Sequence, residues 1–179
     1  MSLFEKKNSI TVKHVTINKP FVFDPVDEGK KIVLKEDAEI TLDVERYSSV
    51  DGKKKTRPGT LKVFFRAGFC TDGASTKKLS FLGIDKAIPP YIACDDVYNA
   101  APFTHDGLYM KEGEIKGASL TRDECDDILR GIWRESGRIG RGKAFFADLG
   151  VFFGAGGKKH WGNDSDKCSQ FFDAEFSFK

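Results

Sequence analysis

The sequence predicts an α+β fold, in which an antiparallel N-terminal sheet packs against two or three helices and a C-terminal strand returns to the sheet. Changes in the spacing of apolar residues along the chain predict this fold class. Apolar and polar residues alternate in the manner of strands from Ser9 to Arg66, and the apolar period becomes helical after about residue 95. The segment from Phe171 to Phe178 alternates again, so we expect the chain to end in a strand of the same sheet.

A length of 179 residues and a hydrophobic content of 40% suit one domain with one buried core. We expect this domain to span 1–179, with a strand-rich half (1–66), a loop and helical half (67–161) and a C-terminal strand or tail (162–179). The 16 phenylalanines bring a large apolar area, which either a β-rich core or an assembly interface would bury.

Short apolar runs separated by Asp, Pro and Gly fill the strand-rich half. The expected strand segments are 10–17, Phe21–Phe23, Ile32–Leu34, Ile40–Val44 and Thr60–Arg66. The lysine-rich stretch Asp51–Gly59 lies between the last two of these strands, so we expect it to form an exposed hairpin loop. Its lysines offer a phosphate-binding surface, but a solvated loop is the favoured interpretation.

A capping-box spacing predicts the start of a helix at Thr121, because Thr121 and Glu124 can satisfy each other's backbone amides. Gly137 is expected to end this helix. Its apolar residues follow at helical intervals, at Cys125, Ile128, Leu129, Ile132 and Trp133. A further helix is expected over Lys143–Phe153.

The charge balance argues against a strong overall attraction to nucleic acid or to membranes, because 29 Lys and Arg face 27 Asp and Glu, for a net charge of +2. The seven Lys or Arg between Arg130 and Lys159 offer a local surface for nucleic acid, although a solvated face is favoured. No apolar run approaches the roughly 20 residues that span a bilayer, so we expect no membrane span. The charged N-terminal segment lacks the apolar stretch of a signal peptide, so we expect a protein made and kept in a cytoplasm.

The four cysteines lie far apart and form no Cys-x-x-Cys pair, so the sequence predicts reduced thiols rather than a zinc or thioredoxin-type motif. Cys70 and Cys125 are interpreted as small core residues, because nothing near them in the sequence indicates an activated thiolate.

The candidate chemistry centres on His105 and Asp126. Helical periodicity turns His105 toward the core with Tyr109 one turn later, and it turns Asp126 inward on the capped helix, together with Arg122. On the same helix Asp123 and Asp127 are expected to face solvent. A buried histidine that faces a carboxylate has a fixed tautomer and suits general-base work.

The Asp-Gly turn of Gly68–Ser75 opens backbone amides and short polar side chains to a ligand. We expect Asp72 and Ser75 to bind a ligand there, together with Tyr109 and Arg122. Asp72 and Asp106 are the candidate ligands of a hard cation such as calcium.

These segments resemble a family of phages and prophages known as domain of unknown function 1353. The likeness covers about residues 60–161. It is carried by Gly68-Phe69, Thr71–Ser75, His105-Asp106, Leu108-Tyr109, Arg122 and Asp126, and it departs at Thr76-Lys77, where the family has an aliphatic residue and proline. The resemblance implies a phage context: other phage structural proteins as partners, synthesis in the cytoplasm of the bacterial host, and incorporation in the virion.

The series His105-Asp106-x-x-Tyr109, with Asp126 on the next helix, is similar to the two-helix core of phospholipase A2. That likeness implies that His105 is the base that activates water, that Asp106 holds calcium and that Asp126 orients the histidine. The paired cysteines that brace phospholipase A2 are missing here.

Two functions remain open at this point. The favoured one is a virion or assembly component, at the neck, tail or capsid, in which the His-Asp centre is a satisfied polar network and Arg122 forms a buried ion pair with Asp126. The alternative is a small hydrolase of an ester or cell-envelope bond that uses His105 as its general base.

Overall fold

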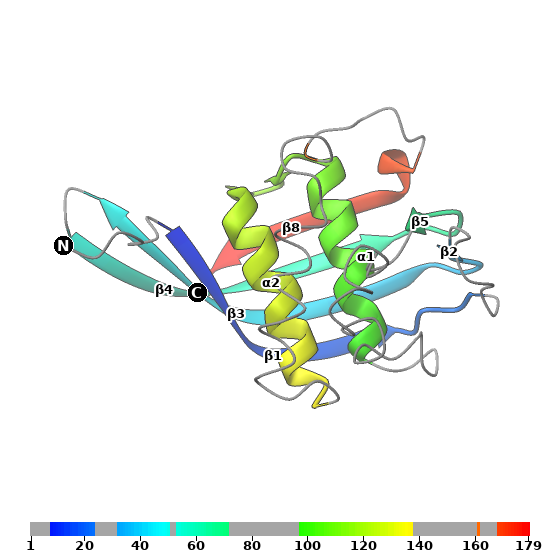
Figure 1. Ribbon diagram of the computed structural model, residues 1–179, viewed down its shortest axis with the longest axis horizontal. Coiled ribbons are helices and arrows are strands. Elements are labelled where there is room, and N and C mark those ends of the chain that lie inside the picture. Colours follow the sequence, from blue (N-terminus) through cyan, green and yellow to red (C-terminus); the bar gives the residue numbers. More distant parts are fainter. Residues whose placement is uncertain (1–7, 24–31, 51–52, 72–96, 138–160, 162–167) are drawn as a thin grey trace, which may run out of the picture.

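The α+β fold is confirmed. The computed structural model describes residues 8–23, 32–50, 53–71, 97–137, 161 and 168–179. A four-stranded antiparallel sheet has the order β1-β3-β4-β8, and two helices lie side by side across one of its faces (Figure 1). The bounds are β1 Asn8–Lys19, β3 Ala38–Val50, β4 Lys53–Phe65, β8 Phe172–Phe178, α1 Val97–Met110 and α2 Arg122–Glu135.

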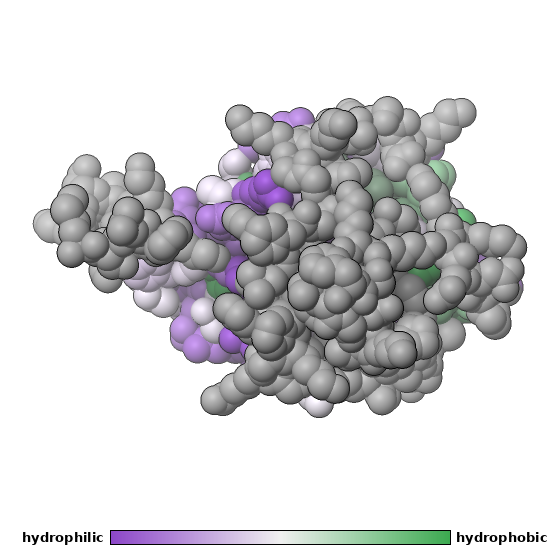
Figure 2. Space-filling model, in the orientation of Figure 1, coloured by the Kyte–Doolittle hydropathy of each residue, from purple (hydrophilic) through white to green (hydrophobic). Residues whose placement is uncertain are grey.

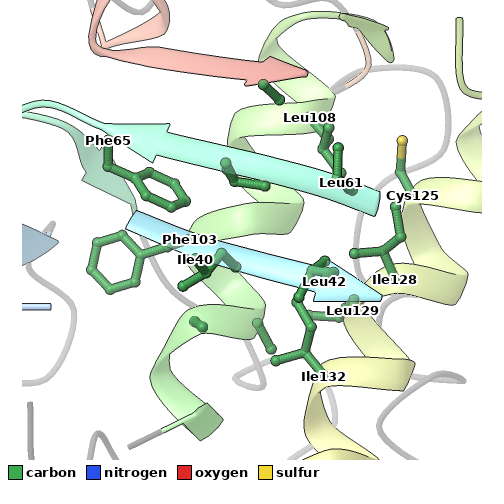
Figure 3. Close-up of a cluster of buried hydrophobic side chains, with 14 of the residues drawn as sticks. Ile40, Leu42, Leu61, Phe65, Phe103, Leu108, Cys125, Ile128, Leu129 and Ile132 are labelled. Carbon is green, nitrogen blue, oxygen red and sulfur yellow. The ribbon is translucent and has the colours of Figure 1, made fainter. Parts of the chain in front are cut away.

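The helix-facing side of the sheet carries the core. Alternate residues of the two central strands are buried there, namely Ile40, Leu42 and Val44 on β3 and Leu61, Val63 and Phe65 on β4. They pack against apolar residues of both helices, such as Phe103, Leu108 and Ile128 (Figure 3). The alternate residues on the opposite face are mostly polar, with ion pairs such as Lys13–Glu45, so the sheet is amphipathic across its two faces.

The C-terminal strand closes the sheet as expected. β8 pairs with β4 from Phe172↔Phe65 to Phe178↔Gly59. Phe172 and Phe176 are buried in the core of the chain itself, whereas Phe178 keeps 45% of its surface exposed.

The expectation of an exposed hairpin loop over Asp51–Gly59 is wrong for most of this stretch. Residues 53–59 belong to β4, which pairs with β3 in unbroken register from Val50↔Lys53 onward. Polar residues occupy both faces of this stretch, which hides the strand period in the sequence. Pro58 is tolerated because the residue pairs of β4 with β8 end at Gly59: the Pro58 carbonyl still accepts the Lys179 amide at 3.0 Å, but the ladder beyond it asks for no amide of residue 58.

Two expected strand segments lie outside the main sheet. β2, Ile32–Val33, pairs with β5, Cys70–Thr71, and Phe23 forms an isolated bridge to Leu34. A second small pair, β6 Glu114–Ile115 and β7 Ala118–Ser119, follows α1, and the short helix η4, Ser169–Phe171, precedes β8. The helix expected over Lys143–Phe153 lies outside the described residues.

The expected capping box at the start of α2 is confirmed. The Glu124 amide donates to the Thr121 hydroxyl at 3.3 Å, and the Thr121 amide donates to the Glu124 carboxylate at 2.8 Å. Glu124 is fully buried, and its carboxylate also forms an ion pair with Arg46 of β3, with 2.7 Å between Arg46 Nε and Glu124 Oε1. The cap therefore ties the helix to the sheet as well as closing its first turn. Among the described helices, none is long and apolar enough to cross a membrane.

Gly131 sets how closely α2 approaches β1. A Cβ added there would lie 2.5 Å from Cγ2 of Val12. Alanine favours a helix over glycine by about 1 kcal/mol, but overpacking a core costs about 1–3 kcal/mol. Because Val12 is branched at Cβ and cannot move its methyl far, we expect Gly131→Ala to lower the free energy of unfolding, as measured by urea denaturation. Val12→Gly in the same chain removes both side-chain atoms that the new Cβ would meet, Cγ2 at 2.5 Å and Cβ at 2.6 Å, so the double variant should lose less than the sum of the two single variants.

Candidate functional site

Helix α1 carries the histidine of the site on its buried face. Ala101, His105 and Leu108 lie on one stripe toward the core, as the helical period predicts. α1 packs along α2, so a residue near the middle of α1 meets the first turns of α2.

Asp126 is the acceptor on which the site converges. His105 Nε2 lies 3.0 Å from Asp126 Oδ1, and the Tyr109 hydroxyl donates to the same oxygen at 2.5 Å. The side chains of His105 and Asp126 are 10% and 13% exposed. The predicted meeting of His105 with Asp126 is confirmed.

Arg122 reaches this network through Tyr109. Its Nε donates to the Tyr109 hydroxyl at 3.1 Å. A direct ion pair between Arg122 and Asp126 was the structural alternative from the sequence; in the structure the Tyr109 hydroxyl donates to the carboxylate oxygen and accepts from Arg122. Trp161 adds an aromatic edge, with its ring centroid 5.0 Å from that of Tyr109.

The other ring nitrogen of His105 faces a second carboxylate. His105 Nδ1 lies 3.5 Å from Oδ1 of Asp106, which is a weak contact. The other oxygen of Asp106 accepts the hydroxyl of Thr71, on β5. The Asp106 side chain is 23% exposed, the most open of the three side chains in this group. The imidazole is therefore held firmly at Nε2 and loosely at Nδ1.

The two carboxylates raise the pKa of His105. Burial alone would lower the pKa of the imidazole, but the hydrogen bonds to Asp106 and Asp126 outweigh the loss of hydration. Burial likewise opposes ionisation of Asp126, yet the hydrogen bonds from His105 and Tyr109 lower the pKa of this carboxyl. Burial and the neighbouring Asp126 raise the pKa of Tyr109, which keeps its hydroxyl a proton donor.

The remaining predicted site residues have different outcomes. Asp72 and Ser75 lie outside the described residues. Thr71 comes from the same segment, but sequence reasoning gave it no role, because nothing in the local pattern links it to Asp106. Asp127 was expected to face solvent; instead its side chain is 13% exposed, accepts the Ile10 amide at 3.2 Å and pairs with Arg130, because α2 lies along β1. Asp123 is exposed as expected.

The described oxygens do not make up a calcium site. Calcium takes six to eight oxygen ligands, whereas the described contacts of the Asp106 carboxylate are the Thr71 hydroxyl, which donates to it, and His105 Nδ1. Within the described ranges no three His, Cys, Asp or Glu side chains gather as metal ligands. Because Asp72 is outside these ranges, its role as a cation ligand stays a prediction.

The expectation of reduced thiols is wrong for two of the four cysteines. Cys70 of β5 and Cys168, just before η4, form a disulfide across 98 positions of sequence. Such a pairing depends on tertiary structure, and spacing does not reveal it. Cys125 is a buried free thiol, as predicted, and burial together with Asp126 raises its pKa well above the usual value. Cys125 is therefore an inert core residue.

Gly107 lets α1 approach the end strand of the sheet. A Cβ at this position would lie 2.1 Å from the ring of Phe172, the first residue of β8. Because Gly107 follows directly after His105-Asp106, this close contact fixes the height of the site above the sheet.

Comparison with protein family models, curated proteins and solved structures found no match to this chain. The resemblances to the phage family and to phospholipase A2 therefore remain predictions.

The pKa shifts predict how the stability of the protein depends on pH. The charged form of His105 has a raised pKa in the fold, so its interactions stabilise the protein fully below pH 6.5, and this stabilisation is lost as the pH rises through the folded-state pKa. The carboxylate of Asp126 has a lowered pKa, so its interactions stabilise the protein above pH 3.8 and are lost as the pH falls through the folded-state pKa. We therefore expect His105→Gln to cost about 1–3 kcal/mol near pH 6 and less above the pKa of His105.

Urea denaturation of both proteins from pH 5 to pH 9 measures this difference. His14→Gln, on the exposed side of β1, is the matched control. A cost for His105→Gln that is the same at every pH would contradict the assigned charge interaction.

Proposed function

We propose that the protein is a hydrolase in which His105 is the general base. The observation that carries the proposal is that the two ring nitrogens of His105 are bound unequally. The distance from Nε2 to the Asp126 carboxylate is 3.0 Å, whereas the distance from Nδ1 to the Asp106 carboxylate is 3.5 Å. A base needs one nitrogen fixed by an acceptor and the other within reach of a water proton. Nε2 is the fixed nitrogen, and Nδ1 is the reactive one.

Each neighbour has a role in that reaction. When Nδ1 takes a proton from water, Asp126 stabilises the imidazolium through Nε2. The Tyr109 hydroxyl, itself supported by Arg122, holds Asp126 ionised and in place. The hydroxide that forms attacks the carbonyl or phosphoryl centre of the substrate, and the proton on Nδ1 then passes to the leaving group.

A purely structural role accounts less well for the second acid. Asp126 alone takes the Nε2 proton of a neutral imidazole, yet a second carboxylate, the partly exposed Asp106, lies 3.5 Å from Nδ1. An acid in that position favours the protonated imidazole, which a reaction cycle must form and discharge. The proposed substrate class, an ester or a bond of the cell envelope, comes from the resemblance to phospholipase A2.

Substitution of His105 and of Asp106 tests the proposal. We expect His105→Gln to lower turnover of p-nitrophenyl esters, phospholipid vesicles or peptidoglycan by roughly 10²-fold or more, because glutamine cannot accept the proton. We expect Asp106→Asn to move the rising limb of the pH–rate profile to lower pH, because one carboxylate that raises the pKa of His105 is gone.

His14→Gln should leave both rate and profile unchanged. A wild type that cleaves none of these substrates between pH 5 and pH 10 would overturn the hydrolase, and so would an Asp106→Asn profile identical to that of the wild type.

The second candidate function is that of a phage assembly component, and the far end of the β3–β4 ribbon favours it. This end, residues 47–50 and 53–58, here called the arm, extends past α2 and away from the helices (Figure 1). Hydrophilic residues gather beside its base (Figure 2). There the exposed Phe178 ring lies 5.5 Å from the Arg57 guanidinium. Projecting ribbons of this kind suit contact with a neighbouring subunit.

The arm predicts a measurable interface. If it joins another chain, the interface should exceed roughly 1,000 Å², and the double variant Arg57→Glu, Phe178→Ser should abolish the association. Sedimentation of the purified protein, and mass spectrometry of purified phage particles, would detect the complex. A wild type that is strictly monomeric and is missing from the particles would rule out the assembly function. The control variant Lys62→Glu lies on β4 outside the arm.

A further inference from the structure

We propose that Arg122 binds an oxyanion of the substrate, a carboxylate or a phosphate, close to the base His105. The inference rests on the proposed function, because it names the class of ester that the same site accepts. That class is an anionic ester whose charge is separated from the bond that is cleaved. Arg122 thereby has a specificity-determining contact in addition to its support of Tyr109.

The guanidinium of Arg122 is held at one of its three nitrogens. Its Nε donates to the Tyr109 hydroxyl at 3.1 Å, and its Cζ lies 5.9 Å from the centroid of the Tyr109 ring. Tyr109 is 4% exposed and belongs to the core, so the group that holds Arg122 is itself fixed in place. Because the guanidinium is planar, an anchor at Nε restricts the directions of the other two nitrogens.

Those two nitrogens, the Nη groups, make no hydrogen bond or ion pair with any residue of the described ranges. Arg122 also lacks a carboxylate partner there, because the Tyr109 hydroxyl lies between it and Asp126. A forked pair of N–H donors with an uncompensated charge fits two oxygens of a carboxylate or a phosphate. Three other arginines, by contrast, each have a carboxylate partner, namely Arg46, Arg66 and Arg130.

Arg122 is partly exposed and is also close to the base. Only the Tyr109 hydroxyl and the Asp126 carboxylate separate its guanidinium from the imidazole of His105. The three contacts along this path measure 3.1, 2.5 and 3.0 Å. A small ester is therefore long enough to touch Arg122 at one end and the water activated by His105 at the other.

The charges at the two ends of this path orient such a substrate. Asp106 faces Nδ1 of His105 and is 23% exposed, whereas Arg122 lies on the Nε2 side of the same ring. An anion is attracted to the Arg122 end and repelled from the Asp106 end. The charged group of the substrate thus goes to Arg122, and its uncharged ester group goes to Nδ1.

Trp161 offers apolar surface for the hydrocarbon between these two groups. Its ring packs against that of Tyr109, with the centroids 5.0 Å apart, and the residue is partly exposed. The tyrosine that holds the guanidinium therefore has an aromatic neighbour that an alkyl chain can contact.

Matched esters test the preference for an anion. The p-nitrophenyl monoesters of succinate, glutarate and adipate carry a carboxylate at increasing distance from the ester, and their methyl diesters are neutral controls of the same length. We expect the wild type to have a higher kcat/KM for an anionic ester than for its neutral control, by roughly 10- to 100-fold, as hydrogen bonds to a charged group give. The chain length with the largest ratio measures the spacing from Arg122 to the base.

Variants on α2 assign this preference to one residue. Arg122→Gln should bring the ratio to about one by raising KM for the anionic ester, and Arg122→Lys should keep part of the ratio, because lysine keeps the charge but loses the fork. Asp126→Asn should lower both rates and keep their ratio, because it damages the base and leaves the guanidinium in place. Arg134→Gln, which removes an exposed arginine of the same helix, should leave the ratio unchanged.

Binding without turnover gives a second readout. Glutarate and inorganic phosphate, each added at constant ionic strength, should shift the ¹⁵Nε–Hε signal of Arg122 in the NMR spectrum. Loss of this signal in Arg122→Gln identifies it, and circular dichroism checks that each variant is folded. A response to only one of the two probes would support the inference and name the oxyanion.

The two readouts separate the inference from the proposed function. An active wild type with equal kcat/KM for anionic and neutral esters would overturn the inference and leave the hydrolase standing, and so would an Arg122→Gln ratio equal to that of the wild type. A wild type that cleaves no ester, but whose Arg122 signal responds to glutarate or phosphate, would refute only the hydrolase. Neither cleavage nor a response would overturn both.

Discussion

The rest of the structure depends on the burial of one face of the sheet beneath two helices. Because Ile40, Leu42 and Leu61 face one way on adjacent strands, α1 and α2 must lie on the same side and touch each other along their lengths. That contact brings position 105 of one helix opposite position 126 of the other, although 21 residues separate them in the chain. The polar centre is a consequence of apolar packing.

Within that packed layer, a single carboxylate oxygen organises the polar groups. Oδ1 of Asp126 accepts from both His105 and Tyr109 in surroundings that exclude most water, where charge-assisted hydrogen bonds are stronger than at the surface. The two donors offset the burial of the charge, and they account for a lowered pKa of Asp126 beside a raised pKa of His105. Loss of either donor leaves the carboxylate partly uncompensated.

Sequence patterns predicted the parts of this arrangement that follow from local periodicity. The capping box at Thr121, the inward direction of His105 and Asp126, and the returning strand at Phe172–Phe178 all depend on spacing within one element. The contacts that escaped prediction join distant elements: Thr71 to Asp106, Cys70 to Cys168, and Asp127 to β1. The strand over residues 53–59 was missed for another reason, because a ribbon with polar residues on both faces has no apolar alternation.

The contact between Gly107 and Phe172 has a consequence for descent. A side chain larger than hydrogen at position 107 cannot coexist with a phenyl ring at position 172, since the added carbon would lie 2.1 Å from the ring. The two positions must therefore change together in any lineage that keeps this helix against this strand. Where both persist, a glycine directly after the His-Asp pair and an aromatic residue opening the last strand form a paired signature, by which divergent descendants of this chain can be recognised after the rest of the sequence has drifted.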